Sequence, residues 1–518
     1  MPNRLFLHQG NPDTSRRKVS MEGHKGGSEN YTVDAMENGA PPNPKILTDE
    51  KGFARSDLEK YDDDGHVART GGWITAYAHI VCAVIGSGVL SLAWGVSWLG
   101  WVAGPLVLFM FAWITWYCSA LLIDCYRYPD TDGEMRNYTY IMAVKRYLGG
   151  KYYIACGAVQ YANMVGTSVG YTVTAGIAAT AIRRSDCFHA DINNPCYISN
   201  NPWMILFGAL QIIFSQIQDI DRIWWMSIVA TLMSFTYSFI GLGECIAQAA
   251  RGGGTGTGTV GGLQIGIDTT AAGKAWGIFQ ALGNIAFAYS FSFILIEITD
   301  TITSPGECKK MKRATVYGIA TTTFFYACIG IIGYAAFGNS APGNLLSGFG
   351  FYNPWWLIDI ANAAIFVHLL GGYQVWIQPF FGFVEASAFR YFPNNRFLQW
   401  ELFAVELPGI GLFRASPFRL IWRTIYVIII TIVAMLLPFF NDIVGLLGSI
   451  GFAPLTVFFP IQMHIVQKKI PRWSGKWLFL QGLNIFCWLI SIVSAIGSVE
   501  GIYADTRNYT PFQTSYRR

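Results

Sequence analysis

Long apolar stretches separated by short polar segments dominate the pattern of this chain. A helix that crosses a membrane needs roughly 20 predominantly apolar residues. Eleven stretches of that kind can be counted, at residues 72–98, 100–124, 152–182, 203–217, 223–247, 275–300, 314–337, 354–384, 420–439, 442–466 and 476–503. The pattern therefore predicts an all-α integral membrane protein of about 11 transmembrane helices.

The segments around these stretches are polar. Residues 1–70 are rich in Gly, Pro, Asn, Asp and Lys and contain no apolar run, so they cannot bury a core. We expect a disordered N-terminal tail over 1–70, a transmembrane domain over 71–505 and a short C-terminal segment over 506–518. The Gly/Thr-rich run at 252–262 is expected to be a flexible loop.

The distribution of charged residues predicts the orientation of the chain in the membrane. Only 13% of the residues are charged, about half the usual share, and a net charge of +4 does not suggest a nucleic-acid partner. Lys and Arg favour cytoplasmic loops. With the N-terminus placed inside, the loops facing outward carry only Arg183, Arg184, Arg251 and Lys274. The sequence therefore predicts a cytoplasmic N-terminus and an extracellular C-terminus.

Two cysteines, Cys187 and Cys196, lie nine positions apart in one of the loops assigned to the outside. Lasting disulfides form in oxidising compartments, so these two side chains are candidates for a bridge. Two free thiols are the alternative.

Two of the apolar stretches contain positions where a helix is expected to break. The first has Gly86-Ser87-Gly88 near its middle, and the sixth has a weaker signal over 283–290. Transporters built from two five-helix inverted repeats place their substrate near the midplane, between broken helices at corresponding positions. A break offers free N–H groups to an anion and free carbonyls to a cation. Close packing of glycines between helices is the alternative explanation.

Polar side chains inside a membrane are costly, so each is a functional candidate. His79 precedes the first break by two turns, and His368 lies deep in the eighth stretch. A histidine titrates near working pH, which suits proton coupling, although a neutral hydrogen-bonded core histidine would look the same in sequence. Tyr161, Asn163 and Asn362 are candidates for substrate contact or for hydrogen bonds between helices.

Patterns of soluble catalysis are missing from the sequence. There is no Gly-x-x-x-x-Gly-Lys motif for nucleotide phosphates and no Cys/His spacing typical of a metal site. We therefore expect no enzyme activity, no metal and no cofactor.

The residues also carry a family resemblance. The stretch 75–94, with its Gly86-Ser87-Gly88 motif, resembles the first helix of plant amino acid permeases of the amino acid/auxin permease family. Segments 136–140, 287–290, 295–298, 341–346 and 359–363 resemble the same family, and the likeness covers residues 70–505 nearly without gaps.

This resemblance implies a LeuT-type fold of ten helices in a 5+5 inverted repeat with helices one and six broken, plus one extra C-terminal helix. It implies proton-coupled import of amino acids across the plasma membrane, with the proton as the coupling ion. In that fold the substrate carboxylate would meet the N–H groups of Gly86, Ser87 and Gly88. The amino group would lie near Ile85 and the second break, which we place at about Asn284, Ile285, Ala286 and Phe287, with Phe287 as a lid.

Other functions are open at this stage. A related carrier could move another carboxylate, such as auxin or GABA, through the same anion-binding break. Coupling to sodium is a second alternative, and an amino acid sensor with little transport is a third. Substrate preference, proton stoichiometry and oligomeric state do not follow from the residues.

Overall fold

The computed structural model describes residues 62, 64, 68–131, 133–191, 196, 198–217, 224–253, 257–350, 354–407 and 411–507. Residues 1–61 of the expected tail and most of the C-terminal segment, 508–518, lie outside them. The expected boundary at residue 70 does not coincide with the first contacts of the chain. Arg69 forms ion pairs, and Gly71 N donates to Thr301 O over 3.1 Å.

The described chain is built almost entirely of helices, as predicted. The first half contains α3 (Trp73–Val84), η2 (Ser87–Ser91), α4 (Leu92–Asp124), α5 (Tyr140–Leu148), α6 (Gly150–Ala190), α7 (Asn201–Phe214) and α8 (Trp224–Ala250). The second half contains α9 (Ala271–Ala288), η4 (Ser292–Ile294), α10 (Leu295–Asp300), α11 (Glu307–Phe337), α12 (Trp355–Tyr391), α14 (Pro417–Leu436), α15 (Phe440–Gly451), η7 (Phe452–Phe458), α16 (Phe459–Gln467) and α17 (Gly475–Thr506).

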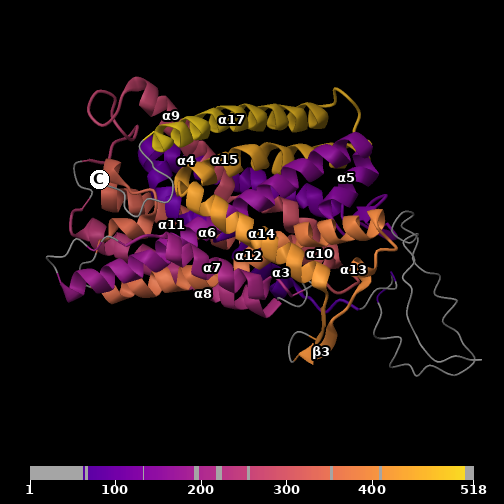
Figure 1. Ribbon diagram of the computed structural model, residues 1–518. Coiled ribbons are helices and arrows are strands. Elements are labelled where there is room, and N and C mark those ends of the chain that lie inside the picture. The colour runs from indigo at the N-terminus through magenta and orange to yellow at the C-terminus, as the bar shows by residue number, and fades with distance from the viewer. Residues whose placement is uncertain are drawn as a thin grey trace, which may run out of the picture. The chain divides into compact units, whose positions relative to one another are not determined.

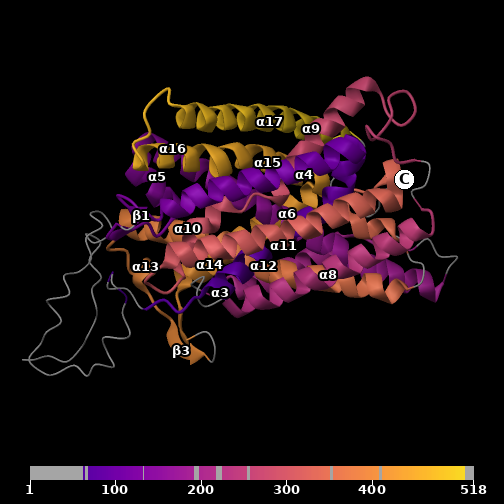
Figure 2. The same ribbon diagram turned by 180° about the vertical axis from the view of Figure 1, so that it is seen from behind.

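Small elements fill the connections. They are the paired strands β1 (Arg127–Tyr128) and β2 (Met135–Arg136), the 3₁₀ turns η5 (Gly338–Ser340) and η6 (Leu345–Gly348), the short helix α13 (Arg396–Gln399) and the antiparallel strands β3 (Phe403–Leu407) and β4 (Gly411–Ala415). The long helices run roughly side by side (Figure 1). Figures 1 and 2 place α5, α13 and the β3–β4 hairpin at one end of the bundle, and the loop before α9 at the other.

All eleven predicted stretches fall on helices. Among the described residues, nine helices are long and apolar enough to cross a membrane, and Trp73–Val84 and Asn201–Phe214 are shorter apolar helices. The protein is a multi-pass membrane protein. The number of crossings is still a prediction, because helix length and composition alone do not fix it.

The helix labelled α4 contains a sharp corner. Gly100 has a φ of 82°, in the left-handed region that favours glycine, and the corner separates the first predicted stretch from the second. The loop before α9 and the first turn of α9 contact this corner. Leu263 N of the loop donates to Ser97 O over 3.0 Å, and Lys274 Nζ of α9 donates to Trp98 O over 2.5 Å. The Gly/Thr-rich run was expected to be flexible, but its described residues 257–262 pack against α4.

One helix is widened rather than broken. The predicted stretch 442–466 is divided among α15, the π-helix η7 and α16. Within it, Phe459 N donates to the carbonyl of Pro454, five residues earlier. Proline has no N–H and its ring crowds the preceding turn, which accounts for the wider turn at this position.

The two cysteines assigned to one outer loop are bonded in the structure. Cys187 and Cys196 form a disulfide, with their Cα atoms 5.9 Å apart. Cys187 belongs to the last turn of α6, so the bridge fastens the start of the following loop to that helix.

Candidate functional site: two broken helices in contact

The first predicted break is present at the predicted residues. Helix α3 ends at Val84, Ile85 and Gly86 leave helical geometry, and η2 begins at Ser87. Residues 85–88 are buried, and the Ser87 hydroxyl has no hydrogen-bond partner among the described residues. The first N–H groups of any helix lack intrahelical acceptors, so the start of η2 can receive an anion.

The second break lies further along the chain than predicted. Helix α9 continues through Asn284–Phe287 to Ala288, and the chain leaves helical geometry at Tyr289–Phe291 before η4. Gly283 does not break the helix; a Cβ there would lie 2.5 Å from the carbonyl oxygen of Gly445, so this glycine permits close packing. Ser290 Oγ donates to Ala286 O over 2.7 Å, a local bond that competes with the helical ladder.

The two breaks touch each other. A Cβ built on Gly88 would lie 3.1 Å from Cα of Ala288 and 3.4 Å from a ring carbon of Phe287. The hydroxyl of Tyr326, on α11, is shared between the carbonyls of Val84 and Ala288, one at each break. A single side chain therefore ties the end of α3 to the end of α9.

Helix α8 supplies hydroxyl groups to the carbonyls of the first break. Ser234 Oγ donates to Ile85 O over 2.9 Å. The Tyr237 hydroxyl donates to the same oxygen over 2.7 Å and lies 3.2 Å from Gly86 O. Each hydroxyl has one hydrogen, and Ser234 Oγ also lies 3.0 Å from Ala230 O. When Ser234 and Tyr237 both donate to Ile85 O, its two lone pairs are used and Gly86 O remains able to accept.

The two candidate histidines both contact this face of α8. His79 Nδ1 lies 2.9 Å from Ser227 Oγ. His368 Nδ1 lies 2.8 Å from Ser234 Oγ and 3.1 Å from Ala230 O. Because a carbonyl cannot donate, the contact with Ala230 assigns a hydrogen to Nδ1 of His368 and leaves Nε2 as the acceptor in the neutral ring.

The free nitrogen of His368 faces the first break. Nε2 is buried without a partner among the described residues and lies 3.6 Å from the position that a Cβ on Gly86 would occupy. The Tyr171 hydroxyl of α6 lies 3.0 Å from the same position. His368 and Tyr171 therefore form the wall opposite Gly86.

The structure does not bring every candidate to the breaks. The ring of Tyr161 packs against Phe380 and Phe383 of α12, at centroid distances of 5.3 and 4.4 Å. Asn163 donates to Leu447 O of α15 over 2.9 Å, and Asn362 donates to Ile358 O of its own helix over 3.0 Å. These three side chains form links between or within helices.

Asn284 also faces elsewhere, toward α15 and α17. Its Oδ1 lies 2.8 Å from the position of a Cβ on Gly445, and Ser498 Oγ lies 2.6 Å from the same point. Of the predicted residues, the structure therefore assembles Ile85, Gly86, Ser87, Gly88, Ala286, Phe287 and His368 around the two breaks, with His79 two turns away.

Sequence reasoning missed the hydroxyl groups that hold the breaks: Tyr171, Ser234, Tyr237 and Tyr326. A signal for part of this set is present. Ser227, Thr231, Ser234 and Tyr237 recur every three or four residues in α8, so they share one face. Thr231 Oγ1 donates to Ala78 O over 2.9 Å, which shows that this face packs against α3.

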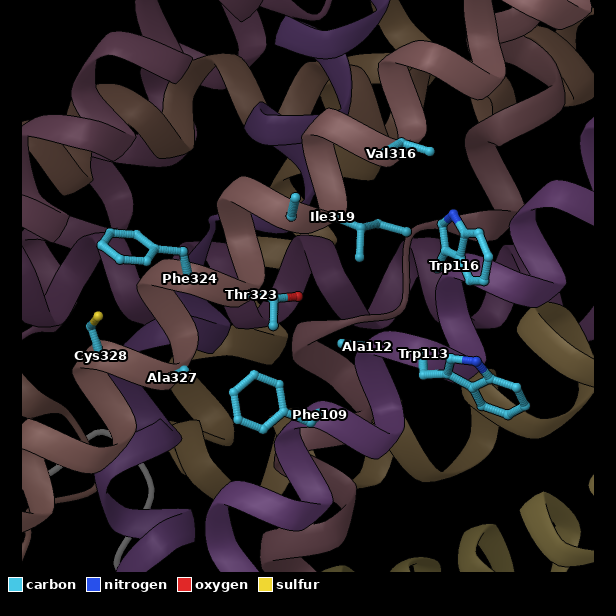
Figure 3. A pocket seen from close by; sticks show the side chains of 11 residues that line it. Phe109, Ala112, Trp113, Trp116, Val316, Ile319, Thr323, Phe324, Ala327 and Cys328 are labelled. Carbon is cyan, nitrogen blue, oxygen red and sulfur yellow. The ribbon is translucent and has the colours of Figure 1, made fainter.

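Another opening in the structure has a different character. A groove of about 540 Å³ lies between α4 and α11, lined by Phe109, Ala112, Trp113, Trp116, Val316, Ile319, Ala320, Thr323, Phe324, Ala327 and Cys328 (Figure 3). Phe109 and Phe324 are more than half exposed, so the groove opens on the outer surface of the bundle. With one hydroxyl and no charged side chain in its lining, it offers nothing to hold a zwitterion.

The ends of the broken helices meet in an ion-pair network at the end of the bundle that holds α5 (Figure 2). Arg69 contacts Asp62, Asp64 and Asp300 over 2.8–2.9 Å, and the hydroxyl of Tyr126 donates to Asp300 over 2.7 Å. Burial alone would lower the pKa of the Arg69 guanidinium, but the three carboxylates outweigh it and raise the pKa. Arg69 is therefore charged at any physiological pH.

Two helices broken in the membrane interior, in contact through their breaks, define a secondary-transporter fold of the LeuT type. The structure of MhsT in complex with L-phenylalanine has this fold and superimposes with a TM-score of 0.54, covering 84% of this chain and 100% of that one at 12% sequence identity. This likeness establishes the fold.

Sequence comparison gives the family. Residues 69–504 match the family model described as transmembrane amino acid transporter protein, and the chain belongs to that family. Amino acid permease 3 of Arabidopsis thaliana is 53% identical over 88% of this chain and 95% of that protein. Amino acid permease 6 of the same plant is 51% identical over 88% and 95%.

Proposed function

We propose that this protein imports amino acids across the plasma membrane together with protons, by alternating access. The observation that carries the proposal is the buried contact between the two breaks, in a chain about half identical to named amino acid permeases. An α-amino acid presents a carboxylate and an ammonium group a few ångströms apart. The first break presents both kinds of group within four residues, N–H donors at the start of η2 and the carbonyl acceptor of Gly86.

The carboxylate is assigned to the N–H groups at the start of η2, with the Ser87 hydroxyl beside them. The ammonium group is assigned to Gly86 O, which has an unused acceptor position, rather than to Ile85 O, which already accepts from Ser234 and Tyr237. Phe287, partly exposed and packed on Gly88, is assigned the substrate side chain.

Residues 85–88 are buried, so a substrate reaches them only when helices move apart. We assign the opening movement to the ends of the broken helices, because an ion pair that can be released lies there. Arg69 links the segment before α3 to Asp300 at the end of α10, and releasing this contact would open the site on the N-terminal side. We assign that side to the cytoplasm and the C-terminus to the outside, from the distribution of Lys and Arg.

The proton is assigned to His368, with His79 as the second candidate. His368 Nε2 is the acceptor that faces the break, and its protonation would add a positive charge next to the substrate carboxylate. The membrane potential would contribute about 2.3 kcal/mol per charge per 100 mV to uptake. The mechanism needs no cofactor and no metal.

The deciding experiment is voltage clamp of cells expressing the protein, in sodium-free medium at about pH 5.5 and 7.5, the range in which histidine titrates. We expect neutral amino acids to evoke an inward current that grows at the acid pH. Auxin and GABA are applied separately. A current evoked by one of them, with none evoked by neutral amino acids, would mean that the substrate is that carboxylate instead. Binding of amino acids without current or labelled uptake would reject transport and indicate a sensor.

His368→Gln keeps a polar group near Nε2 but cannot titrate. We expect it to transport with a weakened pH dependence, and His368→Asn, which leaves that position empty, to transport less. The same pair of substitutions at His79 serves as the comparison. An unchanged pH profile in His368→Gln would reject His368 as the coupling residue.

A further inference from the structure

A second polar cluster lies outside the two breaks, where α9, α15 and α17 meet. It contains a carboxyl group, Asp442, which is 5% exposed. Gln280 Nε2 of α9 donates to Asp442 Oδ1 over 2.6 Å. The transport mechanism above makes no use of this carboxyl group, and a buried carboxyl in a membrane helix is expensive to maintain.

The cluster is continuous across the three helices. Gln280 and Asn284 are four residues apart on α9, so they share a face. Asp442 and Gly445 are neighbours in the same sense on α15, and Ser494, Ser498, Gly501 and Asp505 form one stripe on α17. The missing side chains of Gly445 and Gly501 allow the polar groups to approach: Asp442 Oδ1 lies 2.2 Å from the position of a Cβ on Gly501.

Several members of this cluster are buried without partners. Both polar atoms of the Asn284 amide and the hydroxyls of Ser494 and Ser498 lack a hydrogen-bond partner among the described residues, and all three side chains are fully buried. Asn284 Oδ1 and Ser498 Oγ converge on the same point beside Gly445, at 2.8 and 2.6 Å. Buried polar groups normally have a hydrogen-bond partner, so the amide and hydroxyl groups beside Asp442 offer donors and acceptors that no described residue uses.

The cluster reaches the outer surface through a second carboxyl group. Asp505, on the last turn of α17, is one helical turn beyond Gly501, whose Cβ position lies beside Asp442 Oδ1, so the two carboxyl groups belong to the same contact between α15 and α17. Two neighbouring carboxylates repel each other, whereas one proton shared between them converts the repulsion into a hydrogen bond. Asp505 is exposed, so it can exchange this proton with water.

We propose that Asp442 and Asp505 form a proton-binding site, separate from the substrate site, through which external pH controls how α9 and α17 pack on α15. The inference deepens the proposed function by adding a regulatory proton to the transport cycle. The proton comes from a hydronium ion in external water: one O–H bond of that ion breaks, one O–H bond forms on a carboxylate oxygen, and water is left. The bound proton would hold α17 against α15, and its loss would let the two carboxylates separate.

The effect would reach the breaks through α9. Asn284 lies one turn before Phe287, and a Cβ on Gly448 of α15 would lie 2.5 Å from Phe287 N. Any shift of α15 relative to α9 therefore acts directly on the lid residue of the second break.

The other charged or titratable groups on the helices packed on α15 can be named helix by helix. Helix α17 carries Lys476, Cys487, Glu500, Tyr503 and Asp505, with Arg507 directly after it, and α9 carries Lys274. Helix α6 carries Lys151, Tyr152, Tyr153, Cys156, Tyr161, Tyr171, Arg183, Arg184, Asp186 and His189. Lys274 bonds to Trp98 O and Gly261 O, and Arg507 to the hydroxyl of Tyr503. Asp505 is the carboxyl group among these that lies one helical turn beyond Gly501, at the contact with Asp442.

Infrared difference spectroscopy of the full chain in liposomes tests the site directly. Between about pH 8 and 5, the wild type should gain the carbonyl band of a protonated carboxyl group, and Asp442→Asn should lose most of that gain. Asp505→Asn should shift the midpoint to lower pH by about one unit, because a repelling charge is removed. Glu500→Gln, which removes a neighbouring carboxylate of α17, is the matched control and should behave as wild type.

Transport of the same variants tests the consequence. We expect the change in amino acid KM between acid and neutral pH to fall to within about twofold in Asp442→Asn, against a larger change in wild type and Glu500→Gln. An infrared gain that persists in both Asp442→Asn and Asp505→Asn would overturn the site. Absence of transport in the wild type would reject the proposed function instead, and the infrared titration would still decide this inference. Asp505→Asn changes an exposed residue, so the test survives if Asp442→Asn fails to fold.

Discussion

The two breaks differ in how their backbone groups are satisfied. At the first, carbonyls of Ile85 and Gly86 accept from Ser234 and Tyr237, side chains of another helix. At the second, the Ala286 carbonyl accepts from Ser290, four residues along the same chain. The first break is held open by its neighbours and can exchange partners with a substrate. The second keeps this bond within its own chain, although its Ala288 carbonyl also accepts from Tyr326 of α11.

This difference has a consequence for movement. Groups donated by another helix are lost when that helix moves, so the first break changes its hydrogen bonds as α3 separates from α8. The second break keeps its local bond wherever α9 goes. Substitutions at the contact between the breaks should therefore have the largest effects, and substitutions that leave the contact intact should have the smallest.

The largest effect is expected for Gly88→Val. The new side chain would press on Cα and Cβ of Ala288, which lie 3.1 and 3.2 Å from the Cβ position. Overpacking costs about 1–3 kcal/mol, which corresponds to a fall in uptake of roughly 5- to 150-fold at equal surface expression. Gly482→Val, at a position with nothing within 4 Å, is the control and should retain uptake. Normal uptake in Gly88→Val would mean that the breaks are not in contact during the cycle.

Next in size is Tyr326→Phe. Its hydroxyl is shared between Val84 O and Ala288 O, so the substitution leaves two buried carbonyls with one donor fewer. An unsatisfied buried polar group costs about 1–3 kcal/mol, and we expect uptake to fall about tenfold. Tyr237→Phe is the comparison, because Ile85 O still accepts from Ser234 there. Labelled uptake should fall more in Tyr326→Phe; the reverse order would show that the first break depends on α8 more than on the second break.

A smaller effect is expected at the ends of the broken helices. Arg69→Gln removes the cation that faces Asp62, Asp64 and Asp300. The side chains of Asp62 and Asp64 are each only 9% exposed, but Arg136 lies 3.7 Å from both and remains as their counter-charge. The pair lost without a replacement cation is the one with the partly exposed Asp300, which contributes about 1 kcal/mol, so we expect about a fivefold change in uptake. Asp300→Asn in the same chain should restore part of the loss by removing the carboxylate that has lost its cation. A double variant that recovers no uptake would argue against a direct Arg69–Asp300 contact.

The smallest effect is expected for Tyr161→Phe. The ring packs on Phe380 and Phe383, away from either break, and the substitution keeps it. Changes of this kind usually stay within about 0.5 kcal/mol, so KM should change by no more than about twofold. A larger change in KM for an amino acid, measured by uptake at several concentrations, would place Tyr161 at the substrate after all.

Much of the fold could be predicted because the membrane leaves few choices. Backbone groups in lipid must bond within their own segment, so long apolar stretches become helices and their positions can be read directly. The first break could be located because glycines flank Ser87, and a Cβ on either glycine would contact groups of other helices. The family resemblance drew on the same residues.

The second break was misplaced because glycine has two uses that look alike in sequence. Gly283 accommodates the carbonyl of Gly445, while the chain leaves helical geometry at Tyr289, at the far end of the predicted signal over 283–290. Asn284 was placed at the second break by the family resemblance, and Asn163 and Asn362 were chosen as polar residues inside the membrane. The packing of α15 and α17 turns Asn284 toward Gly445 and Ser498. Asn163 bonds to Leu447 O of α15, whereas Asn362 bonds to Ile358 O within its own helix.

By itself, then, the sequence determined the apolar helices, the glycine break near Gly86, the pair Cys187 and Cys196, and the family. These depend on local composition or on motifs, which a chain carries in any conformation. Only the tertiary structure decided that Tyr326 joins the two breaks, that His368 Nε2 faces Gly86 and that Asp442 meets Gln280. Those contacts join residues far apart in the chain, and the packing of helices, not their sequence periodicity, sets which polar faces meet.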